Sequence, residues 1–479
     1  MVPTINLLPP ELLSEILQRV EQGPKARLNQ HVRFLSHVDR NWRTIALDTP
    51  LLWTKIVTKT SFDAVHDFER ITVWLRRSKT LPINFVLRDI EKGADRALLD
   101  ILKAIGPTLE TLFFESGHYW NLGRMGDGDS AVLSFPRLKK LRSKGILSLM
   151  VVQKHILGAV PSLKQLSIIL HDMQGRDMLK DGWPWLTTLR IPFLPGQAVS
   201  ELFSNAKHLQ HISFSTDTST LQDQRGCRHD ALRSLFIYGY CQPTADFGDY
   251  FPSFPNLEYM GVNLRTLHGT PRYPSLSRLF RACGATLRYL ELHTPSTDVT
   301  QFPYFLSLTP CVRFLPLYGG VTEECVEALV FRPDLDAILP ELEMLSLSEI
   351  KFKQHSLWKL AYSRAQIPVL EPMHQNLEPA PSLTPSTLPS IAAMQISKPP
   401  FRRPLRYITM SEFARTHEHR TRFGWTRLRM RDDLGITLII VGAERHMPRK
   451  DAGELLCLFV DKDAQWDWKE RDYVLKPTW

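Results

Sequence analysis

The clearest pattern along the chain is a hexapeptide of the form Leu-x-x-Leu-x-Leu, which is often preceded by proline and one other residue. Successive copies start 23 to 30 residues apart. Such a regular spacing of apolar positions predicts one short structural unit that recurs along the chain. The copies begin at Leu109, Leu138, Leu163, Leu186, Leu209, Leu232, Leu257, Leu287, Val312 and Leu342.

Each hexapeptide predicts a short strand whose alternate residues point into a coil, while the other residues, about 17 of them, return along the outside. One unit cannot bury its own leucines, but a stack of units can. We therefore predict an α/β fold, with a leucine-rich-repeat solenoid over residues 81–363. It has short parallel strands on the concave face and helices and loops outside. A doubly wound sheet is the alternative, which ten copies in register disfavour.

The N-terminal region has a helical rather than a strand-like pattern. Leucine and isoleucine between Pro10 and Leu17 form an i, i+1, i+4, i+5 stripe, and Pro10 suits the first turn of a helix. A second stripe of one helical face runs from Phe34 to Ala46. Two helices this short bury little surface by themselves, so the pattern predicts that they pack on a partner.

These residues resemble the F-box motif. The resemblance is carried by Leu8-Pro-Pro-Glu-Leu-Leu-x-x-Ile16, by Val38-x-Arg-x-Trp-Arg-x-Ile-Ala46 and by Thr49-Pro-Leu-Leu-Trp53. Together with the repeats, the chain is similar to fungal F-box proteins that carry a C-terminal leucine-rich-repeat region. It departs from the motif at Asp39, where the family has a small or apolar residue.

The resemblance implies a small helical F-box that binds the S-phase-kinase-associated adaptor of an SCF-type ubiquitin ligase, and through it, indirectly, the cullin. Carried over position by position, it assigns the adaptor contacts to Leu8, Pro9, Leu12, Ile16, Leu35, Val38 and Trp42. The alternative is that the two helices only cap the end of the solenoid, because terminal repeats need a cover over their core.

The residues on either side of the second leucine of each hexapeptide are expected to face outward on the concave strand surface. The residue before it is polar in the early repeats, at Lys140, Gln165, Thr188, His211 and Ser234. In the later repeats the same position holds Tyr259, Tyr289, Phe314 and Met344, and Phe236 adjoins this series. Arrays of exposed aromatic side chains anchor protein partners, so these five residues are the candidate substrate-binding residues. Alternatively, the C-terminal region folds over the rings and buries them.

The chain divides into segments of different composition. We expect an F-box at 1–56, a linker helix at 57–80, and the solenoid at 81–363, followed by a Pro-rich linker or insertion at 364–404. A closing repeat segment with a basic stretch follows at 405–479. Residues 398–450 hold 13 basic and 5 acidic side chains, which is nearly all of the net charge of +9. A solvated helix face explains such a stretch more often than nucleic-acid binding does.

No catalytic or metal-binding motif stands out, so we expect neither an enzyme, nor a cofactor, nor a metal site. The six cysteines lie far apart, no signal peptide is evident, and the apolar runs are too short to span a bilayer. These features favour a cytoplasmic or nuclear protein. The expected function is a non-catalytic substrate-recognition subunit of an SCF-type ligase, which binds the adaptor and an unknown protein target. The rival is a stand-alone repeat scaffold with no ligase attached.

Overall fold

The computed structural model of the 479-residue chain divides into two compact units. Among the residues described, the first unit holds those up to Asp217 and 231–238, and the second holds 228–230 and those from Gly239 onward. The structure describes residues 9–22, 37, 40–58, 64–88, 95–115, 133–147, 160–170, 184–194, 196–217, 228–241, 251–266, 276–293, 302–318, 321–331, 338–348, 354–364, 405–411 and 437–441.

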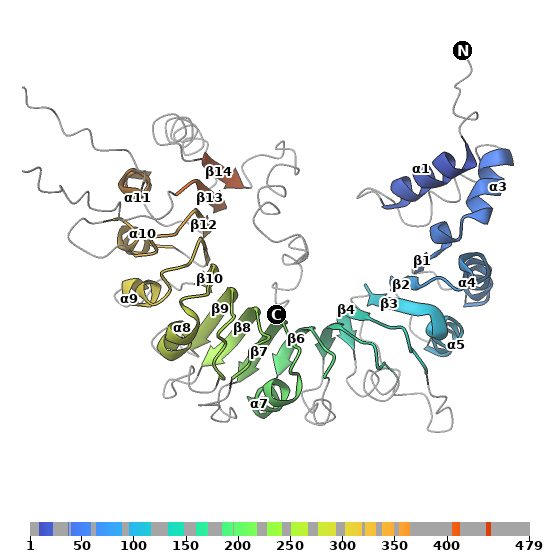
Figure 1. Ribbon diagram of the computed structural model, residues 1–479, viewed down its shortest axis with the longest axis horizontal. Helices are drawn as coiled ribbons and strands as arrows, with labels where there is room; N and C mark the ends of the chain where they lie inside the picture. Colours follow the sequence, from blue (N-terminus) through green and yellow to red (C-terminus); the bar gives the residue numbers. More distant parts are fainter. Residues whose placement is uncertain are drawn as a thin grey trace, which may run out of the picture. The chain divides into compact units, whose positions relative to one another are not determined.

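The first unit starts with short helices and continues as a series of parallel strands (Figure 1). Strands β1 to β7 each pair in parallel with the next strand in sequence order. Its elements are α1 (Pro10–Gln22), α3 (Arg40–Asp48), η2 (Pro50–Trp53), β1 (Lys55–Thr58), α4 (Ala64–Ser78), β2 (Ile83–Leu87), α5 (Asp95–Ile105), η3 (Gly106–Thr108), β3 (Leu109–Phe114), β4 (Lys140–Leu147), β5 (Gln165–Leu170), β6 (Thr188–Leu194), α7 (Gly196–Asn205), β7 (His211–Asp217) and β8 (Ser234–Cys241), of which residues 234–238 belong to this unit.

The second unit alternates strands with short helices, and Figure 1 shows α8 to α11 in a row along one side of its strands. Strands β9 to β14 again pair in parallel in sequence order. Its elements are β9 (Tyr259–Thr266), α8 (Ser277–Cys283), β10 (Tyr289–His293), α9 (Phe302–Ser307), β11 (Phe314–Tyr318), α10 (Glu323–Ala328), β12 (Met344–Ser348), α11 (Gln354–Arg364), β13 (Tyr407–Ser411) and β14 (Thr437–Val441).

A tight turn delivers the chain into many of the strands. The backbone N–H of Leu138 donates to the carbonyl of Phe135, and Pro136 takes the second position of that turn. The same bond joins Leu163 to Val160 around Pro161, and recurs before β9, β11 and β12. Proline suits this position because its fixed φ matches the second residue of a common β-turn. Where it occurs, the repeated proline is thus a turn residue that sets the start of the strand after it.

The leucines of neighbouring repeats stack in register to form the core. Leu141, Leu166, Leu189 and Ile212 are direct partners along β4 to β7, and each is fully buried. Short helices complete the core of the second unit with large apolar side chains, such as Phe280 and Phe305, whose rings lie 6.2 Å apart. A side chain that alternates with these leucines therefore points to the opposite face of the strands.

Two glycines occupy the same place in the repeat, three residues before the hexapeptide. A Cβ atom on Gly106 would lie 2.6 Å from the carbonyl oxygen of Ser134, and one on Gly284 would lie 2.0 Å from that of Leu308. Both oxygens belong to the backbone that leads into the next strand. Glycine is required here because neighbouring repeats approach too closely for any side chain.

The parallel strands in sequence order confirm the predicted α/β leucine-rich-repeat architecture, and the alternative of a doubly wound sheet is wrong for both units. From β4 to β12 each strand begins at the third residue of a predicted hexapeptide. Strands β1 and β2 lie before the first predicted copy and were not foreseen. Of the expected segments, α4 falls within the linker-helix range, whereas residues 365–404 and 442–479 lie outside the described chain.

Candidate binding surfaces

The helical module, formed by α1, α3 and η2, has a small core of its own. Leu13 and Leu17 of α1 are buried, and so are Trp42, Ile45 and Ala46 of α3. The hydroxyls of Ser14 and Thr49 lie 3.2 Å apart and link α1 to the end of α3. One face of α1 is therefore used to hold the module together.

The neighbouring positions of α1 are exposed. Leu12 is 47 % exposed and Ile16 is 36 % exposed, one helical turn apart, and Pro9 just before the helix is also exposed. Leu51 in η2 is 54 % exposed and adds a further apolar side chain to the same module. These residues form the apolar surface of the module, and three of them were predicted as adaptor contacts.

The other predicted adaptor contacts are either buried or outside the described residues. Trp42 is 7 % exposed, so its side chain serves mainly the core between the helices and leaves little surface for a partner. Sequence periodicity placed it on one apolar face but could not say whether that face packs inward. Leu8, Leu35 and Val38, together with the departure at Asp39, lie outside the described residues.

The helical module is joined firmly to α4. The indole N–H of Trp53 donates to the carbonyl of Ala46 at 2.8 Å, and its ring meets that of Trp74 edge-on at 5.0 Å. The guanidinium of Arg77 lies over the same Trp53 ring, 4.3 Å from its centre. A cation held over an indole adds to burial in fixing the ring. The module therefore has a rigid attachment to the first repeats of its unit.

In the second unit, the predicted aromatic series forms one continuous column. Tyr259, Tyr289, Phe314 and Met344 are direct register partners along β9 to β12. The rings of Tyr259 and Tyr289 lie 6.1 Å apart. Tyr407 on β13 extends the series as the register partner of Met344. The sequence pattern did not include Tyr407, because its hexapeptide lies beyond the Pro-rich segment. We call these five residues the aromatic column.

Exposure varies along this column. Tyr259, Phe314 and Met344 are half-buried and keep surface for a partner, whereas Tyr289 is only 7 % exposed. Phe236, predicted to adjoin the series, belongs to β8 in the first unit and is 3 % exposed. These two rings have little area to offer. The binding role of the series stays a prediction, and the alternative of a covering C-terminal region concerns residues outside the described chain.

A buried carboxylate lies beside the aromatic column. Glu291 is 2 % exposed, and its two oxygens accept hydrogen bonds from the hydroxyl of Tyr289 at 3.1 Å and from Nε2 of His293 at 3.2 Å. The His293 ring stacks on Tyr318 of the next strand at 4.9 Å. These contacts fix the tyrosine and histidine rings in place. Because Glu291 is almost fully buried, it positions its neighbours and offers no surface to a large ligand.

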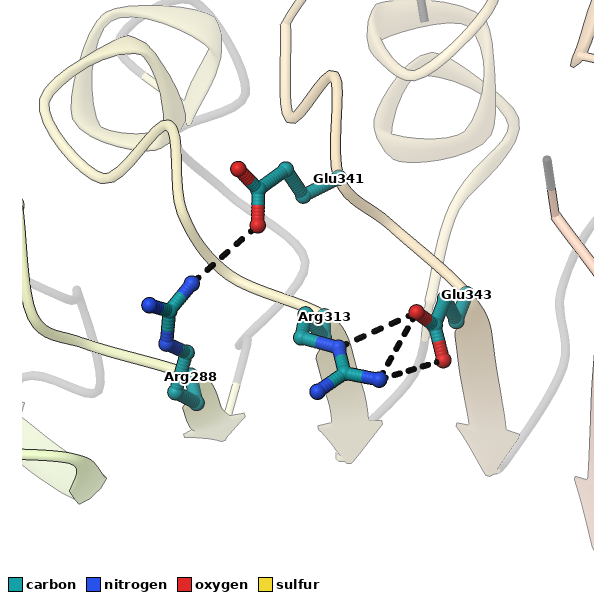
Figure 2. Close-up of polar contacts among 4 residues, drawn as sticks. All are labelled: Arg288, Arg313, Glu341 and Glu343. Carbon is teal, nitrogen blue, oxygen red and sulfur yellow. Dashed lines mark hydrogen bonds and ion pairs between the residues drawn. The ribbon is translucent and has the colours of Figure 1, made fainter. Parts of the chain in front are cut away.

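Charged side chains at the N-terminal edge of the same strands are paired with one another (Figure 2). Arg313 makes a two-pronged contact with Glu343, at 2.8 Å and 2.9 Å from Nη2 to the two oxygens. Arg288 donates to Glu341 at 3.1 Å, across an intervening repeat. Glu343 is nearly buried, whereas Arg288 is largely exposed. Forked arginine–carboxylate pairs of this kind fix geometry as well as adding energy.

The strand face of the first unit has a different chemistry. Over β3 to β8, three successive rows of side chains hold six cations and one carboxylate, Glu110, which pairs with Lys139 at 2.6 Å. Each strand contributes one residue to each row. These are the residue just before its first outward-facing position, the residue at that position, and the next outward-facing residue, two positions later. The six cations, which we call the basic face, are Lys139, Lys140, Arg142, Lys164, Arg190 and Arg233.

His211 lies in the middle row of this face but does not add to its charge. Burial, and to a lesser degree the nearby Arg233 charge, lower the pKa of His211 to about 4. The imidazole is therefore neutral near pH 7 and can act as a hydrogen-bond donor.

Reactive groups are scarce in the part of the chain that the structure describes. Within those residues, no three His, Cys, Asp or Glu side chains gather closely enough to hold a metal ion. Burial raises the pKa of the Cys283 thiol to about 12 and also raises that of Cys325, so both stay protonated and unreactive at neutral pH. None of the described helices is long and apolar enough to cross a bilayer.

No model of a known protein family matches the chain, and no curated protein matches it. Two solved structures are similar at low identity. One is an internalin from Listeria monocytogenes, at 12 % identity and a TM-score of 0.33, over 73 % of this chain and 92 % of that one. The other is a Bacteroides fragilis protein, at 13 % identity and a TM-score of 0.30, over 57 % of this chain and 70 % of that one. The architecture therefore rests on the register of the chain's own strands.

Proposed function

We propose that the chain is the substrate-recognition subunit of an SCF-type ubiquitin ligase, acting in the cytoplasm or nucleus without catalysis of its own. The helical module binds the S-phase-kinase-associated adaptor, and the strand face of the repeats binds a target protein. The observation that carries the proposal is the apolar surface at Leu12 and Ile16, on a helix whose other apolar face is already used for packing.

Leaving such apolar side chains in water is unfavourable. Fully burying a leucine or isoleucine side chain contributes roughly 1.5–3 kcal/mol, so two of them on one helical turn favour a partner with a complementary groove. Pro9, directly before the helix, and Leu51 in η2 are further exposed apolar residues of the same module. The rigid junction through Trp53 and Trp74 supports the same role, because a receptor must hold its target at a fixed place relative to the ligase.

Target capture is assigned to the half-buried members of the aromatic column. Tyr259 and Phe314 present flat, amphipathic or apolar rings from the repeats on either side of Tyr289, and rings of this kind dominate binding energies at protein interfaces. Between these two rings, hydrogen bonds from Tyr289 and His293 to Glu291 hold the side chains of β10 in a fixed arrangement. A pre-ordered surface loses little side-chain entropy on binding.

Co-expression with the adaptor tests the ligase half of the proposal. The double variant Leu12→Glu, Ile16→Glu should abolish co-purification, because both charges would have to be buried in the adaptor groove. The matched control is Val73→Glu, at a 39 % exposed apolar position on α4 of the same unit, which should leave binding unchanged. Trp42→Glu is unsuitable, because charge in the module's core would unfold it.

The outcomes separate the two candidate functions. Failure of the wild-type chain to bind the adaptor, or equal binding by the double variant, would contradict the ligase proposal. If a target is nevertheless captured, the remaining function is a stand-alone repeat scaffold. Circular dichroism of both variants checks that loss of binding does not reflect loss of fold.

A further inference from the structure

We infer that the basic face of the first unit binds an acidic peptide segment of a target protein, lying across strands β4 to β8. The inference rests on the part of the proposed function in which the strand face captures a target. It does not depend on the adaptor, since it concerns a surface away from the apolar residues of α1.

The basic face concentrates charge of one sign on a few neighbouring strands. Lys140 and Arg142 come from one strand, at alternate positions of the same face, and Arg190 comes from the second strand beyond it. Lys139, Lys164 and Arg233 line the edge where these strands begin, and Lys164 and Arg233 are exposed. With only Glu110 among the same rows, the face carries five positive charges in excess. A surface of one sign raises the local concentration of the opposite charge and steers its approach.

This excess contrasts with the corresponding rows of the second unit. Over β9 to β13 they hold three arginines and three carboxylates, so they have no net charge. The contact of Arg313 with Glu343 there shows how the same repeat edge accommodates charge when both signs are present. The charge of the basic face is therefore a local property of these repeats and does not follow from the repeat architecture.

The side chains between the cations suit a peptide. Gln165, Ser167 and Thr188 are half-buried polar groups on the same rows and can bond to carboxylates or to a peptide backbone. His211 stays neutral at physiological pH and adds a donor rather than a further charge. A mixture of cations and small neutral donors matches an acidic chain with amide groups between its charges.

The aromatic residues on these rows argue against single-stranded nucleic acid. Binding of that kind relies on exposed rings that stack with bases. The described rows offer Phe236, which is 3 % exposed, and Phe113, whose ring is already faced by the Arg142 guanidinium at 5.6 Å. The face therefore has the charge but lacks the stacking platforms, and we commit to an acidic peptide.

The experiment measures binding of a fluorescein-labelled peptide, with glutamate at every third position and serine between, to the full-length chain, without adaptor, by fluorescence anisotropy. A glutamine–serine peptide of equal length is the neutral probe, and oligouridine is the nucleic-acid probe. We expect the glutamate peptide to bind and the glutamine peptide not to bind. The affinity for the glutamate peptide should fall as the salt concentration rises.

Two matched triple variants locate the site. Lys140→Glu, Arg142→Glu, Arg190→Glu should weaken binding by about tenfold or more, since it reverses three charges of the face. The control reverses three charges elsewhere in the unit, Arg76→Glu on α4, Lys103→Glu on α5 and Lys207→Glu after α7, and should change affinity by less than about twofold. If the first triple variant does not fold, the variant Lys140→Gln, Arg142→Gln, Arg190→Gln takes its place in the test.

Several results would overturn the inference. They are equal loss in both triple variants, equal affinity for the neutral peptide, tighter face-dependent binding of oligouridine, and loss only when the arginines between 402 and 431 are replaced by glutamine. The double variant Leu12→Glu, Ile16→Glu should bind the peptide as the wild type does. A failed adaptor experiment and a failed peptide experiment are therefore distinguishable.

Discussion

The strand faces of the two units are built by the same rule and have opposite characters. The first outward position holds lysine, glutamine, threonine and histidine along β4 to β7, and tyrosine, phenylalanine and methionine along β9 to β12. Register, turn and buried leucines are alike in both. The difference teaches that the repeat fixes where a side chain points, whereas the identity of that side chain is left open for function.

The contrast extends to how each face treats charge and burial. The second unit neutralises its edge arginines with Glu341 and Glu343 and holds Glu291 inside a bonded row. The first unit holds six cations and one carboxylate in the corresponding rows and carries a histidine whose pKa is lowered. The face of the second unit therefore presents rings, and the face of the first unit presents charge.

The largest expected effect concerns the half-buried rings of the aromatic column. Tyr259→Ser with Phe314→Ser should reduce capture of protein targets by roughly 1000-fold in affinity, because truncating each of these two aromatic anchors costs about 2 kcal/mol. Proximity labelling with quantitative mass spectrometry, with adaptor recovery as the internal reference, provides the measurement. Tyr289 is left unchanged because it is buried.

Two controls make this prediction specific. Gln165→Ala with Thr188→Ala alters the same register position in the first unit, and Tyr362→Ala removes a 67 % exposed ring from α11. Neither should change capture of targets that depend on the aromatic column. Equal capture by the double serine variant and the wild type would remove the column from the proposed function.

The next effect concerns the shared repeat architecture rather than the faces. Gly284→Ala should lower the free energy of unfolding by about 3 kcal/mol, and Gly106→Ala by about 2 kcal/mol, because each methyl group would overlap a backbone carbonyl that cannot rotate away. The larger cost follows from the shorter distance, 2.0 Å against 2.6 Å. Urea denaturation measures both. Ala285→Ser, at the exposed neighbouring position, is the control, and a cost near zero at both glycines would show that the repeats can separate.

The smallest effect is a pH dependence confined to the first unit. The unfolded state binds a proton near pH 6.5, whereas His211 in the folded chain does so only near pH 4. The stability that this neutral histidine allows is therefore complete above pH 6.5 and is lost as the pH falls toward 4. The two pKa values correspond to about 3 kcal/mol, which solvent screening of the half-buried ring reduces to roughly 2 kcal/mol. Subtracting the unfolding free energy of His211→Gln from that of the wild type at each pH isolates this contribution.

A further variant identifies the cause of the shift. Arg233→Ala should remove only a minor part of the pH dependence, because burial lowers the pKa of His211 more than the Arg233 charge does. If that substitution abolished the pH dependence, charge repulsion rather than burial would be the main cause.

Much of the architecture could be predicted from the spacing of leucines, because their burial is what the stack of repeats requires. Strands β1 and β2 escaped the search, since Lys55–Thr58 and Ile83–Leu87 pair without a full hexapeptide. Pairing across strands is a non-local property that a short local pattern cannot contain. The shared position of Gly106 and Gly284 escaped for the same reason, as only the neighbouring repeat makes it restrictive.

The candidate site was predicted in part. Counting from the leucines gave the correct column for Tyr259, Phe314 and Met344, since strand alternation is strict. It could not give the depth of each ring, so the burial of Tyr289 came only from the packed chain. The net charge concealed the basic face, because the six cations are spread over four repeats between Lys139 and Arg233 and contribute little to any one stretch of sequence.

The parallel register of the strands also fixes the spacing at which an extended ligand that crosses them meets successive side chains. Neighbouring strands are spaced by about 4.8 Å, whereas a ligand in the extended polyproline II conformation advances by about 3.1 Å per residue and presents the same face every three residues. The two spacings coincide when three ligand residues span two strands, at roughly 10 Å. Arg142 and Arg190 are two strands apart on the same row, so they match ligand positions i and i+3. A preferred partner would therefore carry its acidic residues with a period of three.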